Sequence, residues 1–109
     1  MPNSGHSGFL ENVAPAANLQ TAEDMAELMR TLSHPDRIEM LRILEFGDST
    51  VGNIAAALDL PHNTASRHLA RLQTAGLVAS RNEGTFRIYT FKRTPLTKLL
   101  LPLMNDVRS

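Results

Sequence analysis

The sequence predicts a mainly α fold with a small β-hairpin (α+β), in the order α-α-α-α-β-β-α. Apolar residues recur at helical spacing in four segments before Gly76. Two short segments after it are rich in β-branched and aromatic residues, and the stretch between them contains Gly84. Helical spacing returns after Pro95. A chain of 109 residues fits one domain, with residues 1–18 as a flexible N-terminal arm and 19–109 as the domain.

Capping signals set the bounds of the first two helices. Thr21 and Asp24 have the spacing of a capping box, in which a hydroxyl residue is followed three positions later by an acidic one. Pro35 ends the first helix and starts a second, because the residue before a proline avoids the α region while proline suits the first turn of a helix. Gly47 then closes the second helix.

A tight corner separates two further helices. Ser49 or Thr50 can cap a short third helix, and the corner at residues 59–61 leads into a fourth helix over about residues 62–75. Gly76 ends the fourth helix.

A hairpin and a last helix complete the domain. The predicted strands are residues 77–81 and 86–91. Thr94 and Pro95 can begin a fifth helix with an apolar stripe, and Pro102 is expected to kink or split it.

Composition excludes several classes of protein. The chain has no cysteine, which excludes disulfides, thiolate metal sites and catalytic thiols. It has no apolar run long enough to cross a bilayer and no secretory leader, so we expect a cytoplasmic protein without a membrane partner. It also lacks a Ser-His-Asp motif, a phosphate-cradling glycine loop and a paired-carboxylate signature. We therefore expect no enzyme and no cofactor.

The overall charge of zero hides a dipolar chain. Residues 1–61 hold three basic and nine acidic residues, a net charge of −6, whereas residues 62–109 hold eight basic and two acidic residues, a net charge of +6. Most of the positive charge falls between residues 67 and 93. Such a stretch is typical of a polyanion partner, although a solvated basic surface would have the same composition.

Two short helices at a tight corner, followed by a hairpin, are typical of a winged helix-turn-helix, whose second helix enters the DNA major groove. Helical spacing turns Ala65, Leu69 and Leu72 inward and leaves polar side chains outward. Asparagine can pair with adenine and arginine with guanine, and each of these polar side chains can also bind a phosphate. Arg71, one turn further along the helix, is better placed for a backbone phosphate. The candidate DNA-binding residues on the helix and the hairpin are His62, Asn63, Thr64, Ser66, Arg67, Arg71, Arg81, Asn82 and Arg87.

The first and last helices each carry an apolar stripe. Part of both stripes is ordinary core, but so thin a domain has too few layers to cover both. We therefore expect the two helices to form a homodimer interface. Its predicted residues are Met25, Leu28, Met29, Leu32, Leu96, Leu99, Leu100 and Leu103.

Several segments, in order and at the expected spacing, resemble the signature of the ArsR/SmtB family of bacterial repressors. The resemblance covers roughly residues 22–91, and its segments are Leu32–Ile38, Ile43–Leu44, Val51–Ala55, Thr64–Leu69 and Ala75–Val78. It implies a dimeric winged-helix protein whose first and last helices form the interface and whose fourth helix reads operator DNA. It also implies DNA-reading positions for Asn63, Thr64, Ser66 and His68. His68 either contacts phosphate or lies at the junction of helix and hairpin.

The sequence departs from the metal-sensing members of that family. The positions of their Cys-Val-Cys are Thr50-Val51-Gly52 here, and residues 95–109 contain no His or Glu. The histidines at 6, 34, 62 and 68 are too scattered to suggest the three or four ligands of a metal site. We therefore predict no metal site, a capping or packing role for His34 rather than a sensing one, and no specific role for His6.

These observations predict a sequence-specific DNA-binding regulator, a homodimeric repressor released from a pseudo-palindromic operator by a non-metal effector. That effector is a small organic molecule or a partner protein, if there is one. The alternative is a winged-helix interaction module that binds an acidic protein partner through the same basic face.

Overall fold

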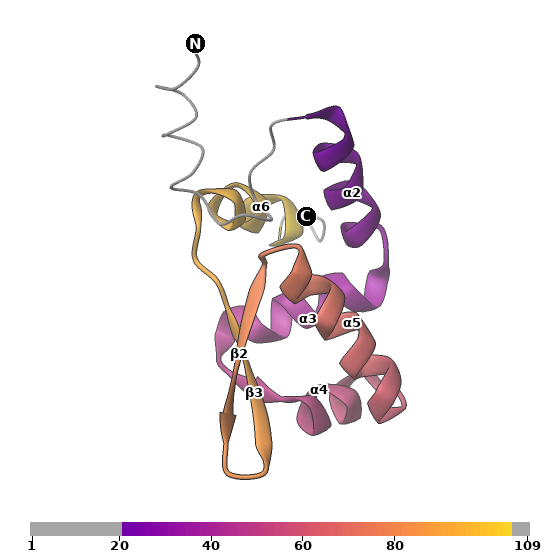
Figure 1. The fold of residues 1–109 in the computed structure, drawn as a ribbon, viewed down its shortest axis with the longest axis vertical. Coiled ribbons are helices and arrows are strands. Elements are labelled where there is room, and N and C mark those ends of the chain that lie inside the picture. Colours follow the sequence, from indigo (N-terminus) through magenta and orange to yellow (C-terminus); the bar gives the residue numbers. More distant parts are fainter. Residues whose placement is uncertain (1–20, 106–109) are drawn as a thin grey trace.

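A computed structural model describes residues 21–105 of the chain (Figure 1). The predicted arm at residues 1–18, and with it His6, lies outside the described residues. The elements are α2 (Ala22–Leu32), α3 (Pro35–Phe46), β1 (Ser49–Thr50), α4 (Val51–Leu58), α5 (His62–Thr74), β2 (Val78–Glu83), β3 (Phe86–Phe91) and α6 (Pro95–Asn105). The predicted α+β fold and the order of its helices and hairpin are confirmed, with β1 as an addition.

Three helices begin at side-chain caps that the sequence indicated. The Thr21 hydroxyl accepts a hydrogen bond from the Asp24 N–H at 3.0 Å, and the Thr50 hydroxyl accepts one from the Asn53 N–H at 3.0 Å. His34 caps α3, because its Nδ1 accepts from the Asp36 N–H at 3.3 Å. Each cap satisfies one backbone donor that the first turn of a helix would otherwise leave without a partner.

The hairpin belongs to a three-stranded antiparallel sheet in the order β1-β3-β2. Its register pairs Val78 with Phe91 and Glu83 with Phe86, and Gly84 takes the positive φ of 61° that the turn needs. The strand β1 pairs Ser49 with Tyr89. Sequence reasoning missed β1 because two residues carry no periodicity.

The core lies where α3, α4 and α5 meet the base of the sheet. The predicted inward face of α5 is confirmed, since Ala65, Leu69 and Leu72 are completely buried. Met40 and Ile54, from α3 and α4, are buried equally well. In Figure 1 the hairpin projects past α4, at the end of the molecule opposite α2 and α6. This packing fixes the orientation of α5 relative to the hairpin.

The last helix continues through Pro102 as a single element, so the proline does not split it. Pro102 is exposed, and its ring therefore displaces no core side chain. Thr94 and Thr97 cap the start of α6 reciprocally, each side-chain oxygen accepting from the backbone N–H of the other residue, at 2.9 and 3.2 Å. Among residues 21–105, no helix is long and apolar enough to span a membrane.

Candidate nucleic-acid interface

The helices α4 and α5 form the helix-turn-helix. Asp59, at the end of α4, takes the left-handed conformation (φ 57°), and the Leu60 N–H donates to the Ala55 carbonyl at 2.9 Å. Helix α5 starts directly after Pro61, and no side chain caps it. Its first-turn N–H groups therefore remain available to a ligand, and the helix dipole favours an anion there.

The residues of α5 that are predicted to contact DNA lie at this exposed end. His62, Asn63 and Arg67 are exposed, while Thr64 and Ser66 are half-buried. Within residues 21–105, none of these five side chains has a hydrogen-bond or ion-pair partner. The polar face of α5 is therefore free to bind base edges and phosphates, while its apolar face is fixed in the core.

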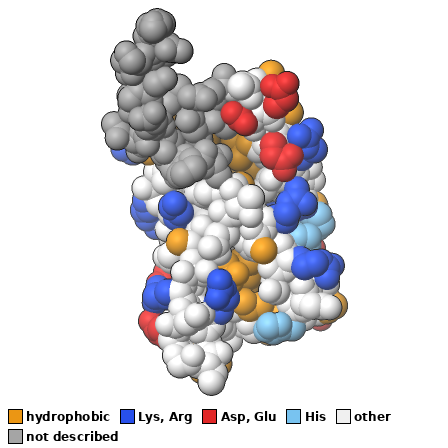
Figure 2. Space-filling model, viewed as in Figure 1, with side chains coloured by type: hydrophobic (Ala, Val, Ile, Leu, Met, Phe, Trp, Pro, Cys, Tyr) orange, Lys and Arg blue, Asp and Glu red, His pale blue; other side chains and the backbone are white. Residues whose placement is uncertain are grey.

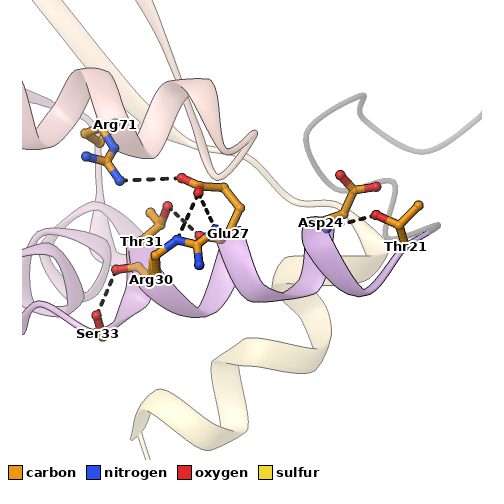
Figure 3. Close-up of polar contacts among 7 residues, drawn as sticks. All are labelled: Thr21, Asp24, Glu27, Arg30, Thr31, Ser33 and Arg71. Carbon is orange, nitrogen blue, oxygen red and sulfur yellow. Dashed lines mark hydrogen bonds and ion pairs between the residues drawn. The ribbon is translucent and has the colours of Figure 1, made fainter.

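Arg71, one turn further along α5, is held by α2. Its Nη2 lies 3.5 Å from Glu27 Oε2, and the other oxygen of Glu27 binds Arg30 Nη2 at 2.9 Å (Figure 3). About half of each of the three side chains is exposed, so these ion pairs are weak. Arg71 would exchange Glu27 for a phosphate at little cost.

His68 lies against the N-terminus of α3, not at the junction of helix and hairpin. Its ring centroid is 4.3 Å from that of His34, with the planes tilted by 58°. Burial lowers the pKa of His68, and the nearby charges of His34, Arg37 and Arg67 lower it further, against the opposing effect of Asp36. The neutral form of His68 is therefore favoured in this electropositive position.

The hairpin carries the three predicted wing residues, and all of them are exposed. Arg81 is tied on two sides, with Nη1 3.0 Å from Asp48 Oδ2 and Nε 2.8 Å from Glu83 Oε2. These hydrogen bonds to Glu83 and Asp48 raise the pKa of Arg81. Arg87 Nη1 donates to Asn82 Oδ1 at 3.1 Å. Asp48 is a partner that sequence reasoning missed, because 33 residues separate it from Arg81.

Charged side chains are unevenly distributed over the surface. Figure 2 shows Arg and His side chains along the edge formed by α5, further basic side chains over the hairpin, and acidic side chains over α2. The basic edge thus adjoins the helix-turn-helix, whereas acidic side chains lie over α2 and also beside the hairpin, where Asp48 and Glu83 contact Arg81.

Three potential metal ligands meet where α3 packs against α5, although their spacing in the sequence suggested none. The candidate atoms of His34, Asp36 and His68 all lie within 4.8 Å of one another. Burial is the main cause of the lowered pKa of His68, and the charges of Arg37 and Arg67 beside it contribute in the same direction. That charge opposes a dication, so the absence of a metal site stays our prediction.

The predicted dimer residues divide into two groups. Leu28, Leu96 and Leu100 are buried in the core of the single chain, and Leu32 is half-buried. The others are exposed apolar side chains, at 42% for Met25, 53% for Met29, 76% for Leu99 and 67% for Leu103. A groove of about 700 Å³ lies between α2, α3 and α6, and Met29 and Leu103 line it together with Ile38 and Met104.

A helix-turn-helix with an exposed polar second helix, followed by a projecting hairpin, defines a winged helix-turn-helix DNA-binding protein. Residues 32–81 match a family model described as a helix-turn-helix domain. The chain belongs to the ArsR/SmtB-like family of winged helix-turn-helix transcriptional regulators, and it is a DNA-binding regulator rather than an enzyme.

Individual relatives agree with this assignment. The chain is 32% identical over 87 residues to the transcriptional repressor PagR of Bacillus anthracis, covering 79% of this chain and 86% of PagR. It is 36% identical over 76 residues to the HTH-type transcriptional regulator Rv0081 of Mycobacterium tuberculosis, covering 69% of this chain and 67% of that protein. The crystal structure of Rv0081 superposes with a TM-score of 0.68 over 77% of this chain and 84% of that one.

A third similar structure is a DNA-binding domain from Mycobacterium bovis, described as homodimeric and as a possible ArsR-family transcriptional regulator. It is 30% identical to this chain, with a TM-score of 0.63 over 77% of this chain and 74% of that one.

Proposed function

We propose that the chain is a cytoplasmic, homodimeric repressor that binds a pseudo-palindromic operator through α5. One observation carries the proposal. The N-terminal half of α5 presents polar side chains that have no partner within residues 21–105, on a helix whose opposite face is completely buried. A rigid helix with an unoccupied polar face fits the major groove, where each base pair presents a distinct pattern of donors and acceptors.

The proposed contacts divide by chemistry. Asn63, Thr64 and Ser66 would read base edges, because amide and hydroxyl groups both donate and accept. His62, Arg67, His68 and Arg71 would bind phosphates or neighbouring bases. On the wing, Arg81, Asn82 and Arg87 would follow the backbone or enter the adjacent minor groove.

Dimerisation would make the contacts symmetric. Four exposed apolar side chains lie on α2 and α6, namely Met25, Met29, Leu99 and Leu103, and two of them, Met29 and Leu103, line the groove between these helices. A second copy would cover these side chains across a two-fold axis. The two α5 helices would then read half-sites about one helical turn apart, roughly 34–36 Å. The homodimeric relative supports this arrangement.

Release from the operator would depend on a non-metal effector. The chain has no thiol ligands, and the charge around His68 opposes a dication. The effector would then be a small organic molecule or a partner protein. It would act by binding one conformation of the dimer better than the other.

Selection of bound sites from a random duplex pool tests the proposal. We expect an enriched motif with two-fold symmetry. Binding of all duplexes alike, even at low salt, would contradict sequence-specific recognition. A symmetric motif would also supply the duplex for a ligand screen that follows release of the bound DNA.

Replacing Arg81 by Ala is expected to lower affinity for all duplexes and to flatten the dependence of log K on log salt by about one unit. A phosphate would have to compete with Asp48 and Glu83 for this guanidinium. Fluorescence anisotropy at four salt concentrations measures the slope, with Arg30→Ala on α2 as a charge-matched control. An unchanged slope would remove the wing arginine from the contact surface.

A further inference from the structure

Three arginines and a histidine converge on one pocket between α3 and α5. The pocket has a volume of about 370 Å³ and is lined by Arg37, Arg67, His68, Ala70, Arg71 and Thr74. No acidic residue is part of the lining. Two carboxylates lie beside the lining residues: Glu27, which binds Arg71 from α2, and Asp36, which lies near His68.

Arg37 is the residue of this pocket whose hydrogen-bond donors the described residues leave without acceptors. It is only 9% exposed, and its Nε and Nη1 are buried without a hydrogen-bond partner among residues 21–105. Burial and the charge of Arg71 both lower the pKa of Arg37. A buried guanidinium without an acceptor is costly, and nearby positive charge increases that cost.

We propose that this pocket binds a phosphate-type oxyanion. An oxyanion would accept hydrogen bonds from Arg67 and Arg71, which lie one turn apart on α5, and would offset the charge of Arg37, which also lines the pocket. The electropositive surroundings that oppose a metal dication at His68 favour an anion for the same reason. His68 can donate a further hydrogen bond through its neutral ring.

Two sources share this chemistry. One is a backbone phosphate of bound DNA, in which case the inference rests on the proposed DNA-binding function and adds α3 to the contact surface. The other is the phosphate group of a free effector. In both cases Arg71 exchanges Glu27, at 3.5 Å, for the anion.

The first experiment measures thermal unfolding of the full chain with inorganic phosphate or chloride at equal ionic strength. If free oxyanion binds, phosphate raises the unfolding temperature of the wild type. Arg71→Gln and Arg37→Met should then lose most of that shift. Glu27→Gln should enlarge it, because Arg71 is no longer held. Lys98→Gln, which removes an exposed charge on α6, should behave as the wild type.

The second experiment measures the salt dependence of duplex binding for the same variants. If the anion is a DNA phosphate, Arg71→Gln and Arg37→Met should each flatten the slope by up to one unit, and Lys98→Gln should not. A phosphate-induced shift with unchanged slopes would assign the pocket to a free oxyanion. A wild-type protein that does not bind duplex would contradict the proposed function but leave the first experiment decisive.

The inference is overturned if Arg71→Gln and Arg37→Met keep the wild-type phosphate response and the wild-type salt slope. It is also overturned if phosphate shifts the unfolding temperature of neither the wild type nor the variants while their salt slopes for duplex binding are equal. In those cases DNA binding by the N-terminal half of α5 would still stand. Arg71 is half exposed, so Arg71→Gln tests the pocket even if Arg37→Met does not fold. Arg37→Met also tests whether the role of Arg37 is purely structural. If it is, the variant should unfold at a lower temperature than the wild type in chloride as well as in phosphate.

Discussion

Leu103→Glu is expected to convert the proposed dimer into monomers and to weaken operator binding by at least about 100-fold. The side chain of Leu103 is 67% exposed in the single chain, so a glutamate there disturbs little of the core. In the dimer the same carboxylate would be buried against apolar side chains without a hydrogen-bond partner. The free-energy cost of that burial would exceed the free energy that the leucine contributes to the dimer. The loss of affinity follows because two linked half-sites bind far more tightly than one.

Sedimentation equilibrium and fluorescence anisotropy measure the two effects together. Leu103→Met is the matched control, since it keeps an apolar side chain of similar volume and should stay dimeric. Circular dichroism should show the same helix content for both variants. A glutamate variant that remains dimeric, or a wild type that is monomeric at every concentration, would contradict an interface at α6.

Asn63→Ala should lower affinity for the selected operator by about 1–3 kcal/mol, or roughly 5- to 150-fold, while random duplex binds almost as before. Asn63 is exposed in the first turn of α5 and has no hydrogen-bond partner within residues 21–105. Its amide is therefore available for a bidentate contact to adenine, and its loss would relax the choice of base at one position of each half-site.

Competition binding with operator and random duplex gives the specificity ratio. Asn105→Ala, on α6, removes the same amide far from α5 and should leave the ratio unchanged. An equal loss on both duplexes would show instead that Asn63 touches only the DNA backbone. Arg67→Ala, in the same assay, reports whether that arginine reads guanine or binds phosphate.

The apolar stripes of α2 and α6 are partly buried and partly exposed, and sequence spacing did not predict which residues belong to which group. Helical spacing placed Leu28, Met29, Leu100 and Leu103 together as interface candidates. The structure buries Leu28 and Leu100 in the single chain and leaves Met29 and Leu103 exposed. Periodicity identifies an apolar face, but how much of that face the chain covers depends on how α2, α3 and α6 pack against one another.

The local sequence was enough to predict the class of fold, the helix starts at Thr21 and Pro35, a third start at Ser49 or Thr50, and the buried face of α5. These features depend on backbone hydrogen bonds and on spacing within a few residues, so the local sequence contains the whole signal. From the same local pattern it also placed the polar residues of α5 on one exposed face.

Which charged groups meet depends on the three-dimensional packing of the elements. The contacts of Arg71 with Glu27, of Arg81 with Asp48 and of His68 with His34 join residues 33 to 44 positions apart. The pocket that encloses Arg37 arises in the same way, from the packing of α3 on α5. Electrostatic energy depends on distances and burial in three dimensions, which spacing along the chain does not specify.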